Sequence, residues 1–324
     1  MRTFTVSLSL IGLSLVAGAS PLRAQATAHQ IGVLTPGLTY SPVFEGLREG
    51  LVKLGYVEGK NIGFAVEDSR GDVQNFPARA AKLVQAKPDL IVTVATAPSM
   101  AVKRATQTIP VVFTVVGDPV QAGLVASYAS SQNNFTGVSS NSAYLSGKRL
   151  EILKDIAPRA KNVLAIVAVK ETNAHMALQY MTDAAKRLQI QVVRQDVAND
   201  EEVTSILAEK WASKVDAVLL LPSVLVTARI GTIIVKAKKE RLPLIVYDDA
   251  SVERGALASY SGNFRLFGDQ AAKLAAKILK GAKPADLPIE TPEKLILKIN
   301  LVTAKAIGLK ISPGVLEGAE TLVE

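Results

Sequence analysis

The chain contains no cysteine and only two histidines. The missing thiols exclude disulfides, a thiolate nucleophile, a Cys-ligated metal and a lipid anchor on an N-terminal cysteine. His29 lies close to the start of the expected mature protein, so His175 has no second imidazole with which to form a zinc site. We therefore expect no metal site and no cofactor. His175 fits a polar surface residue better than a general base.

Motifs that would indicate catalysis or nucleotide binding are also missing. The chain has no Gly-x-Ser-x-Gly elbow, no Gly-x-Gly-x-x-Gly fingerprint and no P-loop. Its formal charge is +8, but the basic residues are spread along the chain and aromatic residues are not interleaved with them. Nucleic-acid binding is therefore not expected, because it needs a basic groove with aromatic rings for stacking.

What is present at the start of the chain is the pattern of an export signal over residues 1–26. Arg2 precedes an apolar stretch over 4–18, and small residues follow around Ala24 and Ala26. The apolar stretch is shorter than the roughly 20 residues of a membrane span. Cleavage near Ala24–Ala26 would leave 324 − 26 = 298 residues, which suits two domains of similar size. The sequence thus predicts a periplasmic protein without a membrane anchor.

After this segment, apolar runs of strand length alternate with segments of helical periodicity. The pattern predicts strands over 31–35, 62–66, 90–94, 111–116, 163–169, 191–197, 217–221, 244–247 and 295–300. It predicts helices over 44–54, 76–84, from about 98, and over 175–189, 201–211 and 264–280, with two short helices at the end. Trp211 is expected in the core at the end of its helix. Repeated strand–helix units form parallel sheets with helices on both faces, so the fold class is α/β.

The helix predicted over 264–280 and the strand over 295–300 do not fit a chain that completes one lobe before it begins the second. A chain that builds one lobe, crosses to a second and returns would have linkers near 141–146, 258–263 and 289–295. The expected first lobe then contains 27–143 plus 262–290, and the second contains 144–261 plus 291–324.

Ligands of parallel α/β sheets bind at the carboxyl ends of the strands, where loops and helix N-termini meet. In the first lobe this rule selects Thr39, Tyr40 and Ser41 after one strand, and Thr96 and Ser99 after another. Ser41 before Pro42 also fits a helix N-cap, and capping is the alternative for Thr96 and Ser99 as well. The helix end near Thr96 is the expected site for a ligand carboxylate.

The same rule selects acidic and polar residues for the rest of the cleft. Asp118 precedes Pro119, where it fits an N-cap or an acceptor for a ligand ammonium group. In the second lobe the selected residues are Asn173, Ser223, Tyr247 and Asp249. Tyr40 and Tyr247 would form an aromatic wall, or would instead pack in the core. Asp248 and Asp249 lack a neighbouring histidine, which argues against metal or acid–base chemistry.

Several segments resemble the family of periplasmic substrate-binding proteins of ABC importers, of the tryptophan/tyrosine type. The resemblance is carried in order by residues 41–50 (SPVFEGLREG), 54–61, 105–113, 117–125 (GDPVQAGLV), 136–137, 145–154, 278–288 (ILKGAKPADLP) and 299–308 (INLVTAKAIG). It implies the type I periplasmic binding fold, with two Rossmann-like lobes, three hinge crossings and a ligand between the lobes. The chain departs from the family pattern at 130–136 and at Ala95, where a glycine is common.

The expected function is therefore that of the solute-binding component of an ABC importer, which delivers a small carboxylated solute to a permease. The resemblance implies an amino acid, preferably aromatic, and other small carboxylates are the alternative. No enzyme activity is expected. Two other functions stay open at this point: a ligand-sensing module that presents its closed form to a membrane receptor, and an exported hydrolase.

Overall fold

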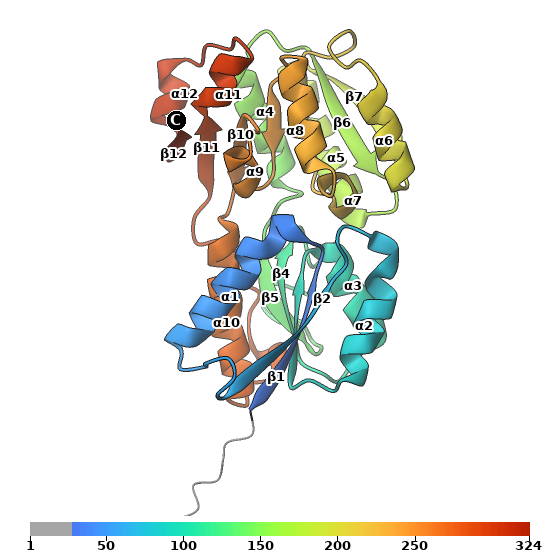
Figure 1. Cartoon of the computed structure of the whole chain (residues 1–324), viewed down its shortest axis with the longest axis vertical. Helices are drawn as coiled ribbons and strands as arrows, with labels where there is room; N and C mark the ends of the chain where they lie inside the picture. Colours follow the sequence, from blue (N-terminus) through green and yellow to red (C-terminus); the bar gives the residue numbers. More distant parts are fainter. Residues whose placement is uncertain (1–27) are drawn as a thin grey trace, which may run out of the picture.

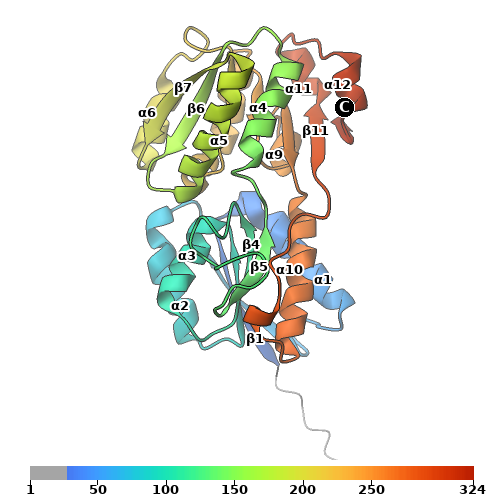
Figure 2. The same cartoon turned by 180° about the vertical axis from the view of Figure 1, so that it is seen from behind.

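The computed structural model describes residues 28–324, which form two α/β lobes stacked along the long axis of the molecule (Figure 1). The export signal predicted over 1–26 lies outside the described residues. Within residues 28–324, no helix combines the length and apolar character needed to cross a membrane. Two sheets, each covered by helices on both faces, confirm the predicted fold class (Figures 1 and 2).

The first lobe surrounds a sheet of five parallel strands in the order β2-β1-β3-β4-β5. The strands are β1 (His29–Thr35), β2 (Ile62–Asp68), β3 (Leu90–Val94), β4 (Val111–Val116) and β5 (Phe135–Ser139). Strands β3 and β4 are buried along their whole length, as expected of apolar runs covered on both faces. Strand β5 was not predicted, because its short Phe-Thr-Gly-Val-Ser sequence lacks a strong apolar run.

Four helices cover this sheet, and one of them comes from a distant part of the chain. They are α1 (Ser41–Lys53), α2 (Phe76–Gln85), α3 (Thr96–Ala105) and α10 (Phe264–Leu279). Helices α1 and α10 pack closely because each has a glycine at the contact. A Cβ atom on Gly46 would lie 1.9 Å from the carbonyl oxygen of Arg265, and one on Gly268 would lie 2.0 Å from that of Val43. These glycines fix the returning helix against the first lobe.

The second lobe surrounds a seven-stranded sheet in the order β12-β11-β10-β9-β8-β6-β7, in which only the β10–β11 pair is antiparallel. The strands are β6 (Asn162–Ala168), β7 (Gln191–Val197), β8 (Ala217–Leu219), β9 (Leu244–Val246), β10 (Ala258–Ser261), β11 (Ile296–Asn300) and β12 (Thr321–Val323). The helices are α4 (Leu145–Ile156), α5 (Thr172–Leu188), α6 (Asp200–Ala208), α7 (Val224–Thr227), α8 (Ile230–Lys239), α9 (Ala250–Glu253), α11 (Leu301–Ala306) and α12 (Pro313–Glu317).

The predicted helix over 201–211 is too long at its C-terminal end. Helix α6 stops at Ala208, and Trp211 lies beyond it, although the Trp211 side chain is buried in the core as predicted. The indole Nε1 donates a hydrogen bond of 3.0 Å to the carbonyl oxygen of Ile206. This bond satisfies a carbonyl group in the last turn, so the indole takes the place of further helix at this end.

The chain passes between the lobes three times: between β5 and α4, between β10 and α10, and before β11. Arg149 of α4 holds the first two passages together. Its guanidinium is fully buried, Nε donates to the carbonyl oxygen of Tyr260 at 2.9 Å, and Nη1 donates to that of Ser142 at 2.7 Å. Burial lowers the pKa of Arg149 to about 9. The residue boundaries predicted for the lobes remain a prediction about which segments move together.

Candidate ligand-binding site

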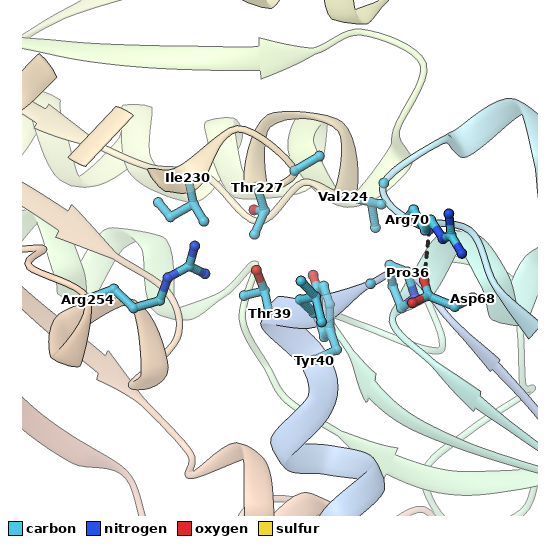
Figure 3. A pocket seen from close by; sticks show the side chains of 13 residues that line it. Pro36, Thr39, Tyr40, Asp68, Arg70, Val224, Thr227, Ile230 and Arg254 are labelled. Atoms are coloured by element: carbon cyan, nitrogen blue, oxygen red, sulfur yellow. Dashed lines mark hydrogen bonds between the residues drawn. The ribbon is translucent and has the colours of Figure 1, made fainter. Parts of the chain in front are cut away.

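Among the hollows lined by residues of both lobes, two are neighbouring chambers that share Tyr40 and Val224. The inner chamber, next to the first passage between lobes, has a volume of about 20 Å³. Its lining consists of Tyr40, Ala95, Thr96, Ala97, Val115, Ser142, Glu171, Asn173, Pro222, Ser223, Val224 and Tyr247. The outer chamber has a volume of about 350 Å³. Its lining consists of residues 36–40, Asp68, Arg70, Gly71, Val224, Thr227, Ala228, Ile230 and Arg254 (Figure 3).

Six of the ten predicted site residues line one of these chambers. Thr39 lies in the outer chamber, and Tyr40 borders both. The inner chamber contains the other four, which are Thr96, Asn173, Ser223 and Tyr247. The rule that ligands bind at the carboxyl ends of parallel strands therefore brought residues from two separate sheets to one cleft.

Glu171 is the main residue of the inner chamber that the sequence analysis missed. Its carboxylate accepts three hydrogen bonds: from the Ser223 hydroxyl at 3.0 Å and from the backbone N–H groups of Val224 and Leu225, each at 2.9 Å. Burial raises the pKa of Glu171, and these three donors act in the opposite direction. Glu171 follows β6 by three residues, so the strand-end rule that selected Asn173 could also have selected Glu171.

Asn173 contacts the first lobe at Gly117, and only a glycine leaves room for this contact. A Cβ atom on Gly117 would lie 1.8 Å from Asn173 Oδ1. The Asn173 side chain is buried, and its Oδ1 atom has no hydrogen-bond partner. Thr96, at the start of α3, accepts a 3.2 Å hydrogen bond from the N–H of Gly117 through Oγ1. A buried amide oxygen without a partner carries a free-energy cost that a donor on a ligand would remove.

A chain of hydroxyl groups crosses the cleft at the boundary between the two chambers. Tyr40 Oη of the first lobe lies 2.7 Å from Tyr247 Oη of the second, which lies 2.9 Å from Thr227 Oγ1. The Tyr40 ring stacks on Phe264 at a centroid distance of 5.5 Å. Burial raises the pKa of both tyrosines, so both phenols are neutral at physiological pH. The two lobes are therefore in direct polar contact through the predicted aromatic residues.

Two residues of the inner chamber have strained backbone conformations. Ala95, the residue before α3, has φ +74° and ψ +167°, a region that is almost confined to glycine. Val115 has φ +57° although its side chain is β-branched, and it lies where the pairing of β4 with β5 shifts register. The glycine that is common in the family at position 95 would relieve the first of these strains. Strain of this kind occurs at functional sites more than elsewhere.

The other four predicted residues line neither chamber. Asp118 caps its own turn by accepting from the N–H groups of Val120 and Gln121, each at 3.0 Å. Ser99 is fully buried, where its hydroxyl bonds to Ala95 O and Thr93 Oγ1. Ser41 is exposed and makes no capping hydrogen bond, so its interpretation as an N-cap was wrong. Asp249 accepts a 2.6 Å hydrogen bond from Asn263 Nδ2 at the second passage between lobes.

The matching family model identifies the class to which the chain belongs. The model of ABC transporter substrate binding protein matches residues 33–323. The chain is therefore a member of this family.

Residues 28–324 contain no group of three or more His, Cys, Asp or Glu side chains placed to hold a metal ion.

Individual relatives agree with this assignment. A tyrosine-binding protein from Clostridioides difficile (strain R20291) is 30% identical over 278 residues, which cover 84% of this chain and 79% of that protein. The solved ABC domain from Streptococcus pneumonia in complex with L-Trp is 26% identical, with a TM-score of 0.85 over 92% of this chain and all of the other. These matches confirm the predicted family and its type I periplasmic binding fold.

A third relative indicates how the lobes of this chain are arranged. The ligand-free, open structure of a substrate-binding protein with adhesive properties from Clostridium difficile is also 26% identical. The match covers 91% of this chain and 99% of the chain of that structure, but the TM-score is only 0.64. At equal identity, the arrangement of the lobes here is thus closer to that in the L-Trp complex. The contact between Tyr40 and Tyr247 across the cleft agrees with this.

Proposed function

We propose that this chain binds an amino acid, aromatic by preference, between its two lobes in the periplasm and presents it to the permease of an ABC importer. It performs no bond chemistry. One observation carries the proposal: the inner chamber combines the Glu171 carboxylate, the unpartnered Oδ1 of Asn173 and the N-terminal end of α3. This set supplies acceptors for an ammonium group and N–H donors for a carboxylate, which are the two charged groups of an α-amino acid.

The assignment of these groups differs from that expected from the sequence. The carboxylate keeps its predicted place at the start of α3, near Thr96. The ammonium group is assigned to Glu171 and Asn173 instead of Asp118 or Asp249, because neither aspartate lines a chamber. The aromatic preference is supported by Tyr40 and Tyr247 and by relatives described as tyrosine-binding or solved with L-Trp.

The inner chamber is too small for such a ligand in the present arrangement. A volume of about 20 Å³ holds roughly one water molecule. The ligand must therefore replace the contact between Tyr40 and Tyr247 and extend towards the outer chamber, with the lobes slightly further apart. The closed lobes would then exclude water from the charged groups, which strengthens each of their contacts.

The test is isothermal titration of the protein after unfolding and refolding, which removes any carried ligand. L-Trp, L-Tyr and L-Phe are expected to bind. 3-Phenylpropionate lacks the amine, phenethylamine lacks the carboxylate, and each is expected to bind about 100-fold more weakly than L-Phe. Binding of 3-phenylpropionate as tightly as L-Phe would contradict the ammonium site, and binding of none of the compounds would contradict the proposal.

Glu171→Gln tests the named residue. It preserves the size of the side chain but removes the charge, so affinity for L-Phe should fall about 10- to 100-fold while that for 3-phenylpropionate is unchanged. Asp118→Asn is the matched control and should leave both affinities as they are. Because burial raises the pKa of Glu171, wild-type affinity should fall as pH decreases through that pKa, and Glu171→Gln should remove this dependence. An equal loss for both ligands would contradict the role of Glu171.

A sensing role would use the same cleft and the same closure of the lobes. Capture of membrane partners with the ligand-bound protein separates the two functions: a permease supports transport, and a receptor supports sensing.

A further inference from the structure

The outer chamber contains a cationic side chain that forms no ion pair within the described residues. Arg254 follows α9 and lines the chamber. Within residues 28–324 its side chain makes neither a salt bridge nor a hydrogen bond. Arg229 nearby is paired with Asp200, whereas the side chain of Arg70, which lines the same chamber, also makes no ion pair or hydrogen bond within the described residues. The chamber lining thus contains two unpaired arginines, Arg254 and Arg70, which differ in the direction of their side chains.

The Arg254 side chain points into the chamber. Figure 3 shows its guanidinium directed towards the space between Ile230 and Thr39, whereas Arg70 on the opposite rim points away from the centre. The guanidinium lies beside Gly231 at the start of α8, where a Cβ atom would be in ordinary van der Waals contact with Arg254 Nη2 at 3.6 Å.

The rest of the chamber suits the apolar part of a ligand. Its volume of about 350 Å³ lies within the range of small-molecule sites, roughly 300–1,000 Å³. Val224, Ala228 and Ile230 form one wall, and the Thr39 hydroxyl projects from the other lobe (Figure 3). Tyr40 and Val224 border both chambers, so one ligand can extend from the inner chamber into the outer one.

We propose that the outer chamber is the subsite for the side chain of the ligand, and that Arg254 selects side chains that end in a carboxylate or a similar anion. This inference rests on the proposed function, since it takes the amino-acid end of the ligand to lie in the inner chamber. The planar guanidinium can bind a carboxylate through two parallel hydrogen bonds, with the Thr39 hydroxyl as a further donor. The preferred ligand class is thus an aromatic amino acid with an anionic substituent at the far end of its ring.

The experiment compares two ligands of the same shape by isothermal titration at low ionic strength. 4-Carboxy-L-phenylalanine carries the distal anion, and 4-carbamoyl-L-phenylalanine is its neutral counterpart. The wild-type protein should bind the carboxylate at least about tenfold more tightly. Arg254→Gln should abolish this preference, so that both ligands bind with about the affinity that the wild-type protein has for the neutral one. Arg70→Gln, on the opposite rim, is the matched control and should keep the preference.

Three results would overturn the inference. Equal affinity of the wild-type protein for the two ligands would show that the chamber does not recognise charge. A preference that survives in Arg254→Gln would assign the recognition to another residue. If L-Tyr binds and no preference is found, only this inference fails. If neither L-Tyr nor the two derivatives bind, the proposed function itself fails.

Discussion

The inner chamber is small and lined by buried polar side chains, whereas the outer chamber is large, mostly apolar and bordered by exposed arginines. In the inner chamber Glu171, Ser223 and the N–H groups of α7 are already bonded to one another. In the outer chamber Arg254 has no such partner. One chamber is thus organised before a ligand arrives, and the other leaves its charged group free for a ligand.

The two chambers also differ in which residues have positive φ angles. In the inner chamber, positive φ angles fall on Ala95 and the β-branched Val115. In the outer chamber, glycine takes two of the three such positions, at 37 and 71, and Arg70 takes the third. Strain is therefore concentrated where polar groups must be aligned. Under the proposed function, the inner chamber would hold the amino-acid end that such ligands share, and the outer chamber the side chain in which they differ.

Gly117→Ala should have the largest effect on this arrangement. The added methyl group would overlap Asn173 across the cleft, since it would lie 1.8 Å from Oδ1 and 2.6 Å from Cγ. Overlap of this kind costs about 1–3 kcal/mol, so affinity for L-Trp should fall by up to about 100-fold. Isothermal titration measures the loss, and thermal unfolding shows whether the separate lobes stay folded.

Gly314→Ala is the control for this substitution, because nothing lies within 4 Å of a Cβ atom there. It should leave affinity unchanged and raise the free energy of unfolding by at most about 1 kcal/mol, because Gly314 lies in α12. Unchanged affinity of Gly117→Ala would show that the Asn173–Gly117 contact is absent from the ligand-bound protein, and hence that the lobes lie further apart there than in the present structure.

Much of the fold was predictable because the longer strands and helices have clear apolar patterns in the sequence. Strands β3 and β4 are continuous apolar runs, and helix α10 has strong helical periodicity. Their predicted bounds differ from the observed ones by at most one residue. The short elements β5, β10, β12, α7 and α9 were missed, since three to five residues carry little periodicity. The twelve-residue helix α4 was missed as well. Their position depends on packing between distant segments, which a local pattern does not contain.

The site was predictable only to the level of strand ends. The strand-end rule found Thr96, Asn173 and Tyr247, but it could not separate residues that face the cleft from those that bond to their own turn. Asp118 and Asp249 were selected for their charge, yet one caps a turn and the other bonds to Asn263. Which acid faces the ligand depends on side-chain direction, and that is fixed by tertiary contacts.

Asp248 gives a prediction about the polar side of the cleft, since it lies directly behind Tyr247. It is fully buried, and burial raises its pKa to about 6 although Ser251 donates two hydrogen bonds to it. An acid whose pKa is raised by folding stabilises the protein below its unfolded value of 3.8 and loses this contribution as pH rises to about 6. The loss amounts to about 3 kcal/mol.

Asp248→Asn removes this titration while it preserves an acceptor for Ser251. Between pH 4 and 7, its free energy of unfolding should therefore rise relative to wild type by about 2 kcal/mol, since part of the loss already occurs below pH 4. Chemical denaturation at several pH values measures the difference between the two proteins, in which contributions of other titrating groups cancel. A constant difference across this range would mean that the Asp248 pKa is not raised, and hence that this side of the cleft is less dry than the structure indicates.

The smallest expected effect tests the strain that distinguishes the inner chamber. Ala95→Gly removes the Cβ atom that makes φ +74° and ψ +167° unfavourable, so the free energy of unfolding should rise by about 1 kcal/mol. Ala101→Gly, in the middle of the same helix α3, should instead lower it by about 1 kcal/mol, because glycine there gains backbone freedom in the unfolded chain. Opposite signs in two alanine-to-glycine changes six residues apart cannot come from composition or from a general loss of packing. If Ala95→Gly destabilised the protein as Ala101→Gly does, position 95 would carry no strain, and Val115 alone would remain to set the inner chamber apart from the outer one.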